Sequence, residues 1–240
     1  MTQPAEPCAG NTAIIPTPKL EEDFYDWHAR HDAKVREAVA RNHALVFIGD
    51  SITHLFEGHP GFPGRGERLW PEYYGRRNAL NLGFGWDRTQ NVLWRLDHGE
   101  FARQTPRLVV VLIGSNNLTG TANARTNSPA EIAEGIGAVC RRIAAAAPKS
   151  QTLLMGVFPR GVPEDPLRAS VREINALTKS FAAGRAGVRF LDIGGRFIAD
   201  DGSIPAALLS DGVHPTEAGY RIWAEAIEPV VAEVVGPRMP

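Results

Sequence analysis

The sequence contains only two cysteines among its 240 residues, Cys8 and Cys140. A disulfide framework needs more cysteines than this, and no cluster of cysteine and histidine has the spacing of a zinc site. We therefore expect Cys8 to be an unpaired thiol near the N-terminus and Cys140 to be a core residue of an alanine-rich helix.

Long apolar runs and an excess of charge of one sign are also missing. No segment approaches the roughly 18 apolar residues that a membrane-spanning helix requires. The net charge is -1, which gives no electrostatic reason to expect nucleic acid or an anionic membrane as a partner. No signal peptide is visible, so the cytoplasm is the expected compartment, although a secreted chain that had lost its signal would look the same.

Several common enzyme motifs are absent as well. There is no GxxxxGK[ST] phosphate loop and no GxSxG turn of the kind found in α/β-hydrolases. Gly83-Phe84-Gly85 resembles the start of a dinucleotide-binding turn, but the third glycine and the acidic residue that binds the ribose are missing. These absences disfavour a phosphate-loop protein, a dinucleotide-binding enzyme and an α/β-hydrolase.

The sequence does contain a regular alternation of apolar runs and amphipathic segments. Strands are predicted at 45–48, 79–82, 108–113, 152–157 and 188–193, with helices between them. The first helix is expected over 20–41, and the last begins near Thr216 and is bent or restarted by Pro229. This alternation predicts one flavodoxin-like, doubly wound α/β domain over 19–240, with a five-stranded, mainly parallel sheet between helices, behind an N-terminal arm of residues 1–18.

Unusual polar residues follow the predicted strands at the points where they end. Asp50 and Ser51 follow the first strand, and the turn 83–87 follows the second. Asn116 and Asn117 follow the third, and Asp211 and His214 lie in the loop after the fifth. Because the carboxyl ends of parallel strands share one edge of the sheet, where open α/β sheets bind ligands, we predict a functional site at this edge.

Ser51 is either a helix N-cap or a nucleophile, since serine is a common cap residue. Asp211 and His214 are three residues apart in a turn. The carboxylate can therefore bond Nδ1 of the imidazole and leave Nε2 free to accept a proton. A surface turn with a capping aspartate is the alternative interpretation of this pair. His54 and His59 are weaker candidates for a base, because no acid lies at a suitable spacing from them.

Asn116 also has two interpretations, because a loop asparagine stabilises turns and its amide can donate to an oxyanion. Backbone N–H groups at Ser51 and in the turn 83–87 would add two further donors, and the positive end of the helix that starts at Ser51 would point to the same place. The acidic residues Asp50, Asp87 and Asp211 offer a different chemistry, since three carboxylates at a sheet edge can bind Mg²⁺.

Four blocks resemble those of the GDSL/SGNH hydrolases and occur in the same order. They are Gly49-Asp50-Ser51-Ile52, the glycine turn after the second strand, Gly114-x-Asn116-Asn117 and Asp211-x-x-His214. The similarity spans roughly residues 44–228. The stretches 79–83, 92–96, 159–161 and 166–168 are similar to the catalytic subunits of platelet-activating factor acetylhydrolase Ib in particular.

The resemblance implies that Ser51 is the nucleophile, His214 the base and Asp211 the acid that orients it. It also implies an oxyanion hole made of the Ser51 N–H, the Asn116 side chain and the N–H of Trp86. Trp86 stands where the family usually has glycine, so this last donor depends on whether the turn needs a positive φ. Supporting residues of the pocket are Asp50, Gly83, Gly85 and Asn117.

The expected substrate is a small-molecule ester with a short acyl group, most often acetyl, hydrolysed without metal or cofactor. The resemblance also implies a homodimer. Alternatives within the fold are a carbohydrate O-acetylesterase, a thioesterase, or a ligand-binding member that has lost turnover.

Overall fold

The computed structural model describes residues 10–238, so the prediction for Cys8 lies outside the described residues. Five strands form one sheet in the order β2-β1-β3-β4-β5, and all neighbouring strands are parallel. The strands are β1 (Leu45–Gly49), β2 (Ala79–Gly83), β3 (Leu108–Leu112), β4 (Gln151–Met155) and β5 (Val188–Leu191). This is the strand order of flavodoxin-like sheets, and the predicted fold class is confirmed.

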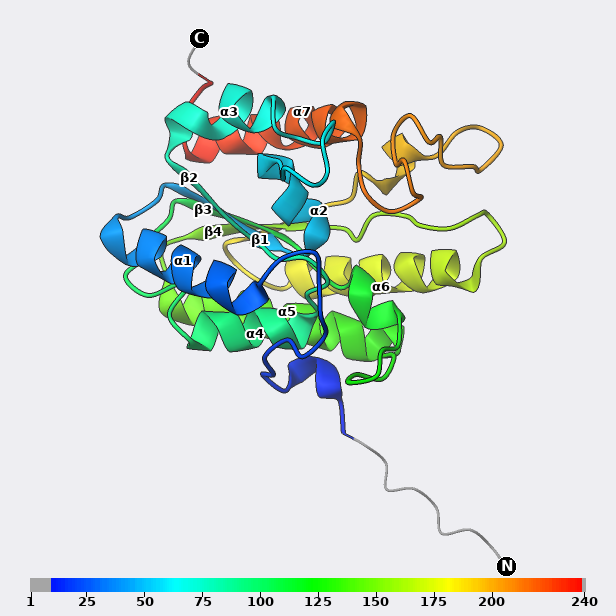
Figure 1. Cartoon of the computed structure of the whole chain (residues 1–240), viewed down its shortest axis with the longest axis horizontal. Coiled ribbons are helices and arrows are strands. Elements are labelled where there is room, and N and C mark those ends of the chain that lie inside the picture. Colours follow the sequence, from blue (N-terminus) through cyan, green and yellow to red (C-terminus); the bar gives the residue numbers. More distant parts are fainter. Residues whose placement is uncertain (1–9, 239–240) are drawn as a thin grey trace, which may run out of the picture.

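Helices cover both faces of the sheet (Figure 1). The α-helices are α1 (Trp27–Ala40), α2 (Ser51–His54), α3 (Leu69–Tyr74), α4 (Thr89–Asp97), α5 (Pro129–Ala146), α6 (Pro166–Ala183) and α7 (Glu217–Val234). Short 3₁₀ turns are η1 (Thr12–Ile14), η2 (Leu55–Glu57), η3 (Gly75–Arg77), η4 (Ser115–Leu118) and η5 (Gly194–Phe197). Helices α3 and α7 lie on one face, and α1, α4, α5 and α6 lie on the other (Figure 1).

Alternate residues of the strands supply the two apolar layers. Phe47 and Val110 pack in the core on the side of α3 and α7, together with Trp223. Ile48 and Val111 pack on the opposite side, with the apolar face of α5. A strand that is covered on both faces has no solvent-facing side, which explains why these strands are continuous apolar runs in the sequence.

The strand order determines at which point of the sheet a ligand is expected to bind. Strand β1 pairs with β2 on one side and with β3 on the other, so the connections that leave β1 and β3 run to opposite sides. Ligands bind at such a topological switch point in open α/β sheets, outside the carboxyl ends of the strands. Ser51 follows β1 and Asn116 follows β3, so both residues lie at this point.

The first helix starts later than predicted, and the last continues through the proline that was expected to bend or restart it. Helix α1 starts at Trp27 and not near residue 20, because Asp26 caps it by accepting a hydrogen bond from the Ala29 N–H. The preceding residues are held in an irregular segment by an ion pair of 2.5 Å between Lys19 and Asp23, whose side chains are almost fully buried. The closing helix α7 runs through Pro229 as one helix, and the buried apolar face on either side of that proline holds its turns together.

Residues 10–18, which were expected to form part of an arm, lie against α4 and α5. The hydroxyl of Thr89 at the start of α4 donates to the carbonyl of Ala13. Cys140 lies on α5 and is buried in the protein core, as expected. Burial raises the pKa of its thiol to about 12. Within residues 10–238 no helix is both long enough and apolar enough to cross a membrane.

Candidate active site

Ser51 is the first residue of α2 and is 9% exposed. The capping role belongs to Asp50, whose Oδ1 accepts a hydrogen bond from the Ile52 N–H at 3.0 Å. The interpretation of Ser51 as a helix N-cap is therefore wrong. Because a neighbour satisfies the helix end, the Ser51 hydroxyl is available for other partners.

His214 is that partner, although 163 residues separate it from Ser51 in the sequence. The Ser51 Oγ lies 2.8 Å from Nε2 of His214, and Nδ1 of the same ring lies 2.7 Å from Oδ2 of Asp211. The ionised carboxylate can only accept, so the hydrogen lies on Nδ1 and Nε2 is left as an acceptor for the serine hydroxyl. The structure brings Ser51, His214 and Asp211 into one continuous hydrogen-bonded chain.

Asp211 also fixes the backbone of the loop that carries His214. Its Oδ1 accepts hydrogen bonds from the N–H groups of Val213 and His214, at 3.0 and 2.7 Å. Partial burial on its own would raise the pKa of Asp211, but the hydrogen bonds from the backbone and ring of His214 lower it to about 2. The carboxylate is therefore ionised throughout the neutral pH range.

Arg65 connects the same loop to the rest of the molecule, a role that no sequence motif indicated. Its Nη1 donates to Oγ of Ser210 and to the carbonyls of His214 and Pro215, at 2.9, 3.0 and 3.0 Å. Its Nη2 lies 3.9 Å from the Asp211 carboxylate. The arginine comes from the Gly/Pro-rich loop between η2 and α3, and it connects that loop to both sides of the histidine.

The turn after β2 faces Asn116 across the switch point. Nδ2 of Asn116 donates to the carbonyl of Asp87 at 2.9 Å, which uses one of its two hydrogens. Trp86 adopts φ 59°, in the left-handed region that bulky residues rarely occupy, and its side chain is 47% exposed. The turn therefore has a positive φ at this position, and the tryptophan adopts it.

Gly83 and Gly85 allow close approaches around this turn. A Cβ on Gly83 would overlap the backbone between Thr53 and His54, and a Cβ on Gly85 would lie 2.8 Å from Oδ2 of Asp23. Tyr25 also donates to the carbonyl of Gly85 at 3.3 Å. The segment before α1 therefore forms the outer support of the turn.

Asn117 points into the protein and not into the site. Its Oδ1 accepts from the Thr89 N–H at 3.0 Å, and its Nδ2 lies 2.9 Å from Gln90 Oε1 and 3.0 Å from Asn127 Oδ1. It is fully buried. Asn117 thus joins η4 to the start of α4 and to the loop before α5, which makes it a support for Asn116.

Asp87 belongs to a buried network of charges behind the turn. Its carboxylate accepts from Nε1 of Trp27 and from Nε of Arg95, both at 2.7 Å. Arg95 also contacts Glu100, whose other oxygen lies 2.9 Å from Nδ1 of His31. The network holds the turn from the inside, since Arg95 also donates to the Leu82 carbonyl at the end of β2.

The arrangement does not support the alternative of a magnesium site. Asp87 is occupied by Trp27 and Arg95, Asp50 caps α2, and Asp211 holds the histidine loop. Across residues 10–238 there is no group of three or more histidine, cysteine, aspartate or glutamate residues that could hold a metal ion.

The competing histidines are placed away from the serine hydroxyl. His54 lies among the rings of Phe24, Tyr25 and His59. Burial, with a smaller effect of Arg30, lowers the pKa of His54 to about 2, so this ring stays neutral. His59 accepts a hydrogen bond from the Gly61 N–H within its own loop.

A cavity of about 380 Å³ opens onto Ser51, Asn116 and His214. Its apolar walls come from Phe24, Leu55, Phe62, Trp86 and Val213, and its charged groups are Arg65, Arg160 and Asp211. The sequence predicted the polar residues at the strand ends but not the two aromatic rings or the two arginines. Pro159-Arg160-Gly161 carries part of the family resemblance, and this was the one signal that pointed to Arg160.

Comparison with known proteins identifies the family of the chain. A model of the GDSL-like lipase/acylhydrolase family matches residues 47–222. The alpha2 subunit of platelet-activating factor acetylhydrolase IB from Rattus norvegicus is 31% identical over 226 residues, which cover 94% of this chain and 92% of the relative.

Solved structures share the fold at lower sequence identity. A GDSL-like lipase from Bacteroides thetaiotaomicron superimposes with a TM-score of 0.63 at 20% identity, over 85% of this chain and 98% of the other. A carbohydrate acetylesterase from Sinorhizobium meliloti gives a TM-score of 0.60 at 20% identity, over 80% of this chain and 99% of the other. The chain therefore belongs to the GDSL-like lipase/acylhydrolase family and is an ester hydrolase.

Proposed function

We propose that the chain is a serine esterase that hydrolyses acetyl and other short-acyl esters through an acyl-enzyme. The observation that carries the proposal is the hydrogen-bonded chain from Ser51 through His214 to Asp211, which opens into a cavity of about 380 Å³. An activated serine needs a base within hydrogen-bond reach and a third group that orients the base, and both conditions are met.

The reaction follows from the positions of these groups. His214 takes the proton of Ser51 as Oγ attacks the ester carbonyl, and Asp211 stabilises the imidazolium that forms. The proton then passes from His214 to the leaving alcohol oxygen, which leaves an acetyl group on Ser51. A water molecule, activated by His214 in the same way, attacks this acyl-enzyme and releases acetate and the free serine.

The oxyanion of each tetrahedral intermediate needs donors, and three are proposed. The N–H of Ser51 lies at the start of α2, where the helix dipole adds to its effect. Asn116 retains one Nδ2 hydrogen after its bond to Asp87. The N–H of Trp86 is the third, in a turn held by the hydrogen bond of Asp87 N to Phe84 O at 3.2 Å. One such donor contributes roughly 10²–10³-fold in comparable enzymes.

An acetylated carbohydrate is a second candidate for the substrate, and the exposed ring of Trp86 favours it. The ring lines the cavity and leaves 47% of the residue open to solvent. Aromatic rings with an open face commonly stack on the apolar face of a sugar. A panel of acetyl esters of simple alcohols, phenols and sugars, measured as kcat/KM, separates this candidate from a simple aryl or alkyl esterase.

The test of the proposed mechanism is to compare wild type with Ser51→Ala. Hydrolysis of 4-nitrophenyl acetate and labelling by a fluorophosphonate probe should both be lost in this variant. Ser180→Ala, at an exposed position on α6, is the matched control and should keep both. Turnover by Ser51→Ala at the wild-type rate would reject the assignment of Ser51 as the nucleophile.

The alternatives make different predictions in the same assay. Loss of wild-type activity on adding EDTA would point to a metal-dependent reaction at the carboxylates. A ligand-binding member without turnover would bind acetyl esters, yet it would show no mass increase at Ser51 after the fluorophosphonate treatment. Faster cleavage of acetyl thioesters than of matched oxygen esters would identify a thioesterase.

A further inference from the structure

We propose that the cavity selects ester substrates that carry a negatively charged group, a carboxylate or a phosphate, and that Arg160 binds this group. The inference rests on the proposed esterase function of the same cavity and adds the chemical class of its substrate. The charged side chains of the cavity wall are the first observation that supports it. Two guanidinium groups and one carboxylate line the cavity, and the carboxylate is the Asp211 side chain that already holds His214.

The two arginines differ in how many of their donors are used. Arg65 has its side chain only 13% exposed and donates to three oxygens of the histidine loop beside Asp211. Arg65 is therefore part of the framework of the site. Its charge is balanced by Asp211, 3.9 Å away.

Arg160 keeps most of its donors. Its Nη1 donates to the carbonyl of Ser115 at 3.2 Å and lies 3.4 Å from the hydroxyl of the same residue. No carboxylate of residues 10–238 lies within 4.0 Å of its guanidinium nitrogens. A guanidinium has five N–H donors in a planar fork. Arg160 thus lines the cavity with donors that have no recorded protein partner, and the charge that acts on it from behind the wall is that of the buried Asp50, whose pKa it lowers.

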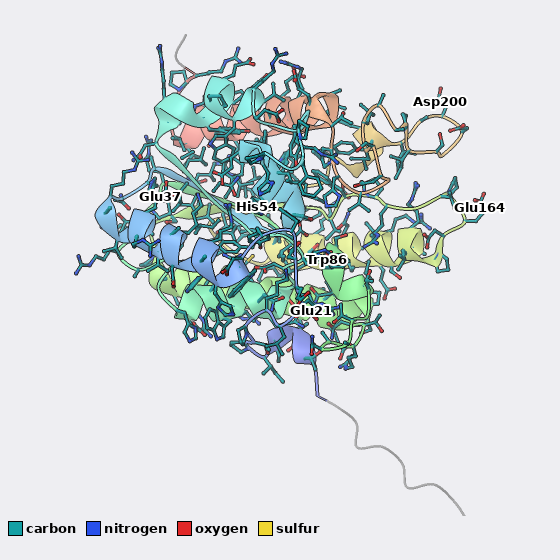
Figure 2. All side chains as sticks on the ribbon, viewed as in Figure 1. Glu21, Glu37, His54, Trp86, Glu164 and Asp200 are labelled. Carbon is teal, nitrogen blue, oxygen red and sulfur yellow. The ribbon has the colours of Figure 1, made fainter. Side chains whose placement is uncertain are left out.

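The backbone around Arg160 is held in place from behind. Arg168, which is 5% exposed, donates from Nε to the Arg160 carbonyl at 3.1 Å and from Nη2 to the Gly161 carbonyl at 2.6 Å. Its Nη1 donates to the Gly202 carbonyl at 3.2 Å. The two loops joined in this way project from the functional edge of the sheet, and Figure 2 labels Glu164 and Asp200 near their tips.

A preorganised guanidinium with free donors is the group that proteins use for planar, two-point binding of carboxylates and phosphates. Phe24, Phe62 and Val213 give the cavity an apolar wall, and a charge pair beside such a low-dielectric surface attracts more strongly than it does in open water. The proposed substrate therefore has a short acyl group at Ser51 and an anionic group within reach of Arg160.

Arg160 has a simpler alternative role, which is to hold Ser115 and thereby position Asn116. The experiment separates the two roles with esters that differ only in charge. The anionic esters are 3- and 4-acetoxybenzoate, and the neutral matches are 3- and 4-acetoxybenzamide. 4-Acetoxyphenyl phosphate distinguishes a phosphate from a carboxylate. The measured quantity is the ratio of kcat/KM for the anionic ester to kcat/KM for its neutral match, for wild type and for Arg160→Gln and Arg160→Lys.

The ratio should fall by about 10- to 100-fold in Arg160→Gln, since one charged hydrogen bond is lost from the anionic ester only. Arg160→Lys should recover part of the ratio, because the charge is kept and the planar fork is lost. Arg36→Gln, which removes one exposed positive charge on α1, should leave the ratio unchanged. Raising the ionic strength should lower the wild-type ratio. The larger effect, on carboxylate or on phosphate, identifies the preferred group.

An equal loss of kcat/KM for anionic and neutral esters in Arg160→Gln would overturn the inference and assign Arg160 to the support of Asn116. In that result the proposed esterase function would stand, because wild type would still hydrolyse both esters. Failure of wild type to hydrolyse any of these esters would instead reject the proposed function, and the inference with it.

Discussion

Asn116 and Asp87 are joined by a hydrogen bond of 2.9 Å from the Asn116 side-chain amide to the Asp87 backbone carbonyl. The bond links the turn after β3 to the turn after β2 across the switch point of the sheet. It also sets the orientation of the amide, so that its second hydrogen is available to a bound group. The side chain of the neighbouring Asn117, by contrast, forms its hydrogen bonds with buried partners.

These two asparagines should therefore respond differently to the same substitution. Asn116→Ala is expected to lower kcat on 4-nitrophenyl acetate by roughly 10²–10³-fold, as for the loss of one oxyanion donor, with little change in melting temperature. Asn117→Ala should lower the free energy of unfolding by about 1–3 kcal/mol, because buried donors and acceptors lose their partner. Steady-state kinetics and urea unfolding of both variants check this. The assignment of Asn116 fails if its variant loses stability but not kcat.

Trp86→Gly should make the protein more stable or leave its stability unchanged. The tryptophan holds φ 59°, a conformation that costs a bulky residue about 1–3 kcal/mol and glycine almost nothing. Glycine loses more backbone entropy on folding, by about 0.5–1 kcal/mol, and this offsets part of the gain. Urea unfolding measures the net effect.

The same variant also tests the role of the ring. KM for acetylated sugars or aryl acetates should rise, while kcat on a small ester such as ethyl acetate should be retained, because the N–H stays in the turn. A large fall in kcat on the small ester would show that the indole itself, and not only the backbone, takes part in the reaction.

Arg65→Met should lower kcat about tenfold or more by releasing the loop of His214. The substitution removes three hydrogen bonds, to Ser210, His214 and Pro215, and leaves a side chain of similar length in the wall. The effect should fall on kcat more than on KM, since the arginine acts through the histidine. Arg65→Lys should restore part of the activity. Equal activity of Arg65→Met and wild type would mean that Asp211 alone is enough to hold the loop.

Asp50→Asn should change how stability depends on pH. Burial raises the pKa of Asp50 from 3.8 to about 7, and the nearby Asp87 adds to the effect. Because the folded-state pKa lies above the unfolded-state value, ionisation opposes folding, and this group makes the protein less stable as pH rises from about 4 to 7. Asparagine keeps the cap on α2 and cannot ionise.

The variant should therefore gain stability relative to wild type over that pH range, by about 1–4 kcal/mol, and the difference should level off above pH 7. Urea unfolding at a series of pH values measures it. A stability difference that does not vary with pH between 4 and 7 would show that Asp50 titrates near its ordinary value.

The fold and the polar half of the site could be predicted because each depends on local patterns. Apolar runs such as Leu108–Leu112 identify buried parallel strands, and a polar residue directly after such a strand must lie at the carboxyl edge of the sheet. Ser51 and Asn116 follow from that rule, whereas His214 was placed there because it lies in the loop that follows the fifth strand. The role of Asp50 as the cap did not follow from it, because Asp and Ser are equally good caps and the choice depends on the turn.

The walls of the cavity could not be predicted, since they come from loops without periodicity. Phe24 lies in a segment that the helical pattern assigned to α1, and its position depends on the buried Lys19–Asp23 ion pair. Arg65 and Arg160 lie in Gly/Pro-rich loops. In such loops the spacing of residues in the sequence does not predict the direction in which a side chain points. Their contacts with Ser210 and Ser115 are made over long separations in the sequence and appear only when the chain is folded.

The segment before α1 lies outside the stretch that the family model matches, residues 47–222, yet Phe24 forms part of the cavity wall and Tyr25 supports the turn at Gly85. Part of the cavity wall is therefore encoded outside the stretch that carries the residues proposed for the reaction. In evolution the two parts can change independently. Relatives that share every motif of the reaction can then diverge in specificity through a short N-terminal stretch that motif comparison does not examine.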